Sequence, residues 1–156
     1  MEAQMKDMME SEEWEARFGA LKLAEIVILQ LASSDAENRT KHAAGLDHLS
    51  SCLLERSTKL MEDKEFRVRK ALGPALGARA RLDGALVLQK MRGALLKNIK
   101  ENVERSPGSD EKPAGSVRYS HEAKGDLMHD TEGWRSLDTS VGTFAQILSE
   151  AVFSSP

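Results

Sequence analysis

Cysteine is nearly absent from this chain, which has one cysteine in 156 residues. A disulfide within the chain is therefore excluded, and a reducing compartment, the cytoplasm or the nucleus, is the simplest expectation. Cys52 stands in no pattern typical of a catalytic thiol. We expect it to pack as a small apolar residue on a helix face.

Long apolar runs are also missing. The longest, Ala24–Ala32, contains Glu25 and Gln30 and is too short to cross a bilayer. The first residues, MEAQMKDMMESEE, are acidic and lack the apolar centre of a signal peptide. The sequence therefore predicts no membrane segment.

An excess of positive charge is absent, since the formal net charge is −3. Nucleic-acid binding requires a basic surface, so we expect no nucleic-acid partner. A local basic cluster of Arg67, Arg69 and Lys70 is offset by neighbouring acids. It is interpreted as a solvated helix face.

Aromatic residues make up only 4% of the chain, and runs of alternating β-branched residues between turn signals are missing. Strands are therefore not predicted. The chain is instead rich in Ala, Leu, Glu, Lys and Arg, which favour helix. The fold class is predicted to be all-α.

Apolar residues spaced three or four apart mark the expected helices. Residues 1–10 are predicted to be disordered, 11–105 to form helical repeats, 106–118 to form a flexible loop, and 119–156 to form a terminal helical unit with a frayed end. Pro74 is expected to kink or restart its helix. The expected helices span 11–32, 40–62, 65–81, 85–105 and 134–153, with a break at 82–84 and a short helix and turn within 121–133.

Two stretches share one pattern at an offset of 52 residues. In each, an acid precedes an arginine by four residues, which favours an ion pair along one helix face. Small residues after the arginine allow a neighbouring helix to approach closely. The aligned pairs are Glu13 with Glu65, Trp14 with Phe66, Ala16 with Val68, and Arg17 with Arg69.

The stretch LMEDKEFRVRKALGPALGA, residues 60–78, resembles a HEAT repeat of the armadillo-type superfamily. In that family the turn between helices A and B carries an acid, and helix B opens with Val-Arg. Here Glu62-Asp63 and Val68-Arg69 match those features. The resemblance extends from Leu46 to Leu88, and it lacks the usual proline early in helix A.

The resemblance implies a short α-solenoid of antiparallel helix pairs, each of which covers the apolar face of the next. It also implies a non-catalytic scaffold or adaptor that binds other proteins, without a cofactor. The chain is expected to be part of a larger helical-repeat assembly or to cover its ends with partners. The protein-binding residues proposed on this basis are Arg67, Lys70 and Trp134.

Two alternatives remain open from the sequence. The segment His121–Asp130, HEAKGDLMHD, carries residue types that bind metals, but Gly125 stands where a zinc-protease motif requires its second histidine. A metal-binding protein or enzyme using this segment is therefore one alternative. The other is a tubulin-binding TOG-like module, because Trp14 and Arg17 resemble the helix start of such modules, which are HEAT arrays.

Overall fold

The computed structural model of the chain describes the backbone of residues 2–104 and 123–153 and the side chains of 4–101 and 137–152. Within these ranges the chain is helical apart from three short turns, and no strand occurs. The prediction of an all-α fold is confirmed. The expected loop at 106–118 and the frayed end at 154–156 lie outside the described residues.

The N-terminal residues differ from the prediction of disorder. Helix α1 spans Glu2–Glu10 and packs against α2 (Trp14–Ala32) and α3 (Ala36–Met61). Met5 and Met9 lie one helical turn apart and are both buried in the core. An ion pair of 2.8 Å between Arg56 and Glu10 fixes the C-terminal end of the helix. The acidic residues around the methionines hid this apolar face.

Helix α3 begins four residues earlier than predicted, at Ala36 instead of Thr40. Asp35 supplies the N-cap, because its carboxylate accepts a hydrogen bond of 2.8 Å from the Asn38 N–H. The buried side of the helix carries leucines on one face, with Leu53 and Leu60 enclosed. Ser57 fills the remaining turn and donates to the Leu53 carbonyl at 2.7 Å.

Helix α4 (Phe66–Glu104) joins two expected helices into one, with a bend at Asp83. Asp83 has φ −158° and ψ 84°, and its carboxylate accepts from the Leu86 N–H at 2.9 Å. This bond caps the second half of the helix, so the predicted break at 82–84 is present as a kink. The backbone stays helical through Pro74.

Helix α5 (Ala123–Phe153) is continuous, whereas a turn was expected before Trp134. It packs along α4, where glycines permit close approach. A Cβ atom added to Gly73 would meet Thr143 at 3.1 Å, and one added to Gly84 would meet Ala151 at 2.4 Å. The contacts advance in the same direction along both helices, from Gly73 with Thr143 to Gly84 with Ala151. Helix α5 therefore runs parallel to the first half of α4.

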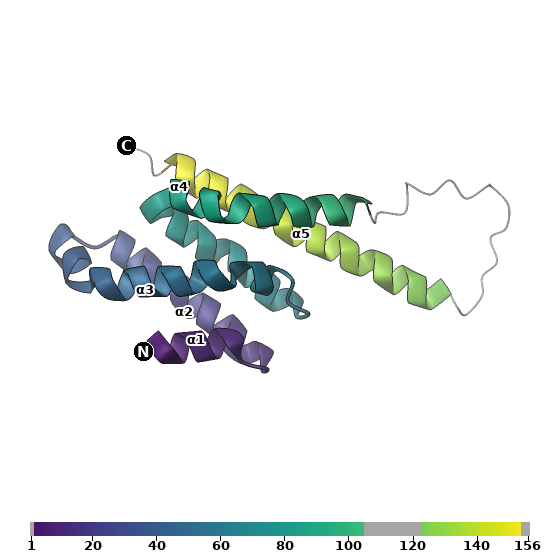
Figure 1. Ribbon diagram of the computed structural model, residues 1–156, viewed down its shortest axis with the longest axis horizontal. Helices are drawn as coiled ribbons and strands as arrows, with labels where there is room; N and C mark the ends of the chain where they lie inside the picture. Colours follow the sequence, from purple (N-terminus) through teal and green to yellow (C-terminus); the bar gives the residue numbers. More distant parts are fainter. Residues whose placement is uncertain (1, 105–122, 154–156) are drawn as a thin grey trace.

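Three helical segments, α2, the first half of α4 and α5, run in the same direction (Figure 1). The alternating segments, α1, α3 and the second half of α4, run the opposite way. The core lies between these segments. Its largest enclosed side chains include Leu21, Ile28, Leu53, Val68, Leu72, Leu76, Met91, Leu95 and Ile147.

Candidate functional site

The starts of α2 and α4 are joined by a nearly enclosed ion pair. The Arg17 guanidinium donates from Nε to Asp63 Oδ2 at 2.6 Å and from Nη2 to Asp63 Oδ1 at 2.9 Å. The two side chains are only 16% and 8% exposed. Asp63 precedes α4, so this two-pronged contact fixes the start of α2 to the start of α4.

The two arginines of the internal repeat make equivalent hydrogen bonds. Arg17 Nη1 donates to the carbonyls of Ser11 and Glu12, at 2.7 and 2.8 Å. Arg69 Nη1 donates to the carbonyls of Asp63 and Lys64, at 2.6 and 3.2 Å. Each acceptor in the second set lies 52 residues after its counterpart in the first. The two helix starts therefore share one local structure.

The predicted ion pairs one turn apart, Glu13 with Arg17 and Glu65 with Arg69, do not form among the described side chains. Arg17 instead reaches across to Asp63, and Arg69 folds back onto the turn before its helix. Both arginines gain part-buried acceptors, the Asp63 carboxylate and the Ser11 carbonyl for Arg17 and the Asp63 carbonyl for Arg69. An exposed pair along one helix contributes only about 0.3–0.5 kcal/mol, so the part-buried contacts are favoured over it.

Asp63 is held in its charged form. Burial alone would raise the pKa of its carboxyl group, but hydrogen bonds from the Arg17 guanidinium and the Glu65 N–H outweigh burial. The charge of Arg69 acts in the same direction. The pKa of Asp63 is consequently lowered from 3.8, and the pKa of Arg17 is raised, chiefly by its hydrogen bond to Asp63.

The proposed protein-binding residues Arg67 and Lys70 lie beside aromatic rings at the same helix starts. The Arg67 guanidinium carbon stands 4.8 Å from the centre of the Trp14 ring, and Lys70 Nζ stands 5.7 Å from the centre of the Phe66 ring. Trp14 also meets Phe18 edge-on, with ring centres 6.3 Å apart. Arg67 and Lys70 are exposed, so they and the rings form an accessible surface.

Trp134, the third proposed binding residue, lies in α5, but its side chain is outside the described set. Val68 of the repeat motif is fully buried, as the pattern predicted. The segment His121–Asp130 also lies outside the described side chains. Among the side chains that are described, no group of three or more His, Cys, Asp or Glu converges on a point where a metal would sit.

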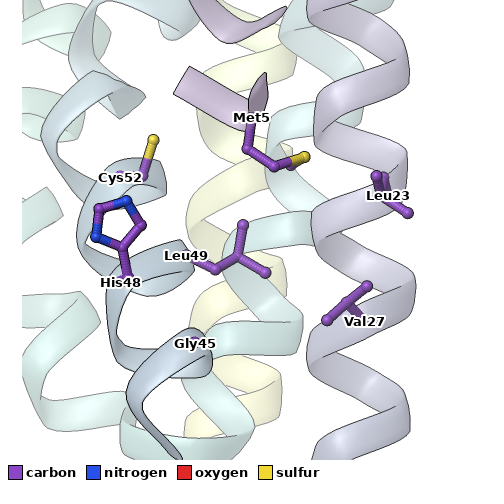
Figure 2. Close-up of a pocket in the computed structure, with 7 residues that line it drawn as sticks. All are labelled: Met5, Leu23, Val27, Gly45, His48, Leu49 and Cys52. Carbon is purple, nitrogen blue, oxygen red and sulfur yellow. The ribbon is translucent and has the colours of Figure 1, made fainter. Parts of the chain in front are cut away.

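An apolar hollow lies where α1, α2 and α3 meet (Figure 2). Leu49 of α3 and Val27 of α2 point toward each other across it, and Met5 of α1 lies above them (Figure 2). Its volume is about 40 Å³, whereas small-molecule sites measure about 300 Å³ or more. The remaining lining residues are Leu23, Gly45, His48 and Cys52.

Apolar side chains continue from the hollow onto the surface. Leu23 is 42% exposed and Ile26 is 60% exposed, both on α2. With Val27, these residues form what we call the α2 strip. Helix α1 packs against α2 but leaves this part of the α2 surface uncovered. An exposed apolar strip beside a hollow is a surface that contact with another apolar group would bury.

Cys52 packs in the hollow wall as predicted and is buried. Burial raises the pKa of its thiol, and the nearby Arg56 guanidinium only partly offsets that effect. The thiol therefore carries little thiolate at neutral pH.

We expect Cys52 in the folded chain to react with Ellman's reagent at least tenfold more slowly than in the chain unfolded in guanidinium chloride. Burial and the raised thiol pKa both oppose formation of an accessible thiolate. Free cysteine measured in the same buffers corrects for the effect of the denaturant on the reagent. Equal rates for the folded and unfolded chain would contradict the enclosed position of the sulfur.

Comparison of the chain with family models, with curated protein sequences and with solved structures found no match. Within the described ranges, no helix combines the length and the apolar content that crossing a bilayer requires.

Proposed function

We propose that the chain is a non-catalytic protein-binding scaffold built from HEAT-like helix pairs. The pairs are α1 with α2, α3 with the first half of α4, and the second half of α4 with α5. Support for the repeat comes from the matched hydrogen bonds of Arg17 and Arg69 and from the parallel course of α2, the first half of α4 and α5. The acid that the family carries in its turn corresponds to Asp63.

The observation that carries the binding role is the α2 strip. Three adjoining aliphatic side chains on one helix, two of them substantially exposed, border an apolar hollow. Leaving this area in water has a free-energy cost of about 25 cal/mol per Å². A partner that inserts an apolar side chain at the strip removes that cost. Binding of this kind depends on buried apolar area and requires no reactive group.

The proposal is tested by replacing Ile26 with aspartate and recovering partners from cells of the native organism. The recovered amount of each protein that the unmodified chain captures is expected to fall at least tenfold with Ile26→Asp, because a charge at the strip opposes its burial. Val152→Asp is the matched control, since Val152 is also an exposed aliphatic residue and lies on α5, which packs mainly on α4.

Both substitutions are at exposed positions, so unfolding free energies should change by no more than about 0.5 kcal/mol. Capture that is insensitive to Ile26→Asp, or equally sensitive to Val152→Asp, would show that the strip is not the binding surface. If the unmodified chain captures no protein above background, the scaffold role itself fails.

Charge reversal of Arg67 and Lys70 in the same assay examines the surface at the helix starts. Tubulin binding remains a prediction for that surface and is read from co-sedimentation with microtubules. A cytoplasmic or nuclear location remains a prediction based on the single cysteine.

A further inference from the structure

Helix α5 turns a polar side toward the core. The residues that it buries within the described range are Thr139, Ser140, Thr143 and Ile147, and the first three carry hydroxyl groups. The Ser140 hydroxyl donates to Asn98 Oδ1 of α4 at 2.7 Å, and this bond is itself buried. Because a surface helix normally buries its apolar side, α5 departs from the usual pattern.

The outward side of α5 is apolar. Val141 is 48% exposed, Leu148 is 38% exposed and Val152 is 68% exposed. Spacings of seven and four residues place these side chains on one face of the helix, whereas α5 packs mainly on α4 through its other face. Six apolar residues on or beside the outward face form what we call the α5 strip: Leu137, Val141, Phe144, Ala145, Leu148 and Val152.

The α5 strip has the same spacing from either end. The gaps between its successive members are four, three, one, three and four residues. If a second copy of α5 lies antiparallel about a two-fold axis midway between residues 144 and 145, every member of the strip faces another member. Leu137 then faces Val152 of the second copy, and Val141 faces Leu148 of the second copy. A two-fold interface between identical chains requires such a self-complementary surface.

The charges along α5 favour the antiparallel direction. From residue 137 to residue 152 the only charged residues are Asp138 and Glu150, and Glu150 accepts hydrogen bonds from Arg81 of α4. In a parallel pair the two copies of Asp138 would face each other, which is destabilising beside an apolar interface. In the antiparallel pair they lie about 20 Å apart along the helix axis, so the middle of the interface contains no charge.

We propose that the chain forms a homodimer in which the α5 strips of two copies pack antiparallel about a two-fold axis. The contact removes both exposed strips from water at once, because the interface uses the same surface twice. The strip spans about 22 Å of helix, which is small for a protein interface. We therefore expect a dissociation constant in the micromolar range. This interface is separate from the α2 strip and does not depend on it.

Sedimentation equilibrium of the full chain from about 1 to 200 µM tests the dimer. The average mass is expected to rise with concentration from 17.2 kDa toward twice that value. Leu148→Asp and Val152→Asp should each weaken dimerisation at least tenfold, because each places a charge between apolar side chains. Ile26→Asp is the matched control, since Ile26 is 60% exposed on α2, and it should change the dissociation constant less than twofold.

Three results would overturn the proposal. The first is a mass of one chain throughout the concentration range. The second is equal weakening by Ile26→Asp, which would move the interface to the α2 strip. The third is growth beyond two copies, because a closed two-fold interface stops at a dimer. Loss of the dimer in Val152→Asp leaves the α2 strip intact, so a failed dimer and a failed capture of partners are distinguishable.

The direction of packing is tested by disulfide formation in chains that carry Cys52→Ala. The pair Val141→Cys and Leu148→Cys in one chain is expected to give a disulfide-linked dimer on oxidation, because these positions face each other across the axis. Val141→Cys alone should give at least fivefold less, since its two copies lie about 10 Å apart along the helix axis, beyond the reach of a disulfide. Equal yields from the single and the double variant would contradict the antiparallel pair.

Discussion

Replacing Gly84 with leucine is expected to destabilise the folded chain by about 3 kcal/mol. At this position even a single added Cβ would lie 2.4 Å from the Cβ of Ala151 and 2.9 Å from its Cα. The second contact is with backbone, so rotation of a side chain cannot relieve it. Either α5 separates from α4 along this stretch, or the kink at Asp83 opens. Urea unfolding followed by far-ultraviolet circular dichroism gives the change in unfolding free energy.

The matched control is Gly93→Leu, in the second half of the same helix. A Cβ added to Gly93 meets no described atom within 4 Å, so the substitution should gain up to about 1 kcal/mol of helix propensity. Gly84→Ala adds the single Cβ atom that meets Ala151, so it should also lower the unfolding free energy. Combining it with Ala151→Gly should recover part of that unfolding free energy, which a double-mutant cycle detects as coupling between the two positions. Equal destabilisation at positions 84 and 93 would show that α5 does not rest on α4 at this point.

Asp63→Asn is expected to lower the unfolding free energy at pH 7 by about 3 kcal/mol, since it leaves a shielded guanidinium without its counter-charge. The exposed Asp47→Asn, on α3, is the control and should change stability by no more than about 0.5 kcal/mol. Urea unfolding at a series of pH values measures both variants against the unmodified chain.

The pH dependence of that difference has a defined sign. Because folding lowers the pKa of Asp63 below 3.8, the folded state holds the proton less readily than the unfolded state. The stabilisation from Asp63 is therefore complete above about pH 5 and is lost as the pH falls through the folded-state pKa. The difference in unfolding free energy between Asp63→Asn and the unmodified chain should therefore become smaller as the pH falls. A gap that is constant from pH 7 to pH 3 would rule out the charge as its cause.

Much of the helical architecture is predictable from spacing alone. Val68 and Leu72 lie four residues apart, and both are fully buried, because side chains at that spacing share one helix face. The break near Asp83 is likewise visible in the sequence as Leu-Asp-Gly. Helix α1 is not predictable in this way, since methionines interspersed with acids carry too little apolar pattern to exceed the signal for disorder.

The partners of side chains are harder to predict than their helices. From sequence, Arg17 has a nearby acid in Glu13, and only the packing of α2 against α4 brings Asp63 closer. The turn acid of the HEAT resemblance was the one available signal for this contact. The hollow among α1, α2 and α3 depends on how several helices meet, which no single segment encodes.

The contact between Arg17 and Asp63 also limits how this chain can be shortened. Arg17 belongs to α2 and Asp63 to the turn between α3 and α4, so neither helix start is neutralised without the other. A truncation in the turn between α2 and α3 would leave an orphan acid on one fragment and an orphan base on the other. The segment before that turn and the segment after it are therefore not independent units, and any shorter version of the chain should retain both residues.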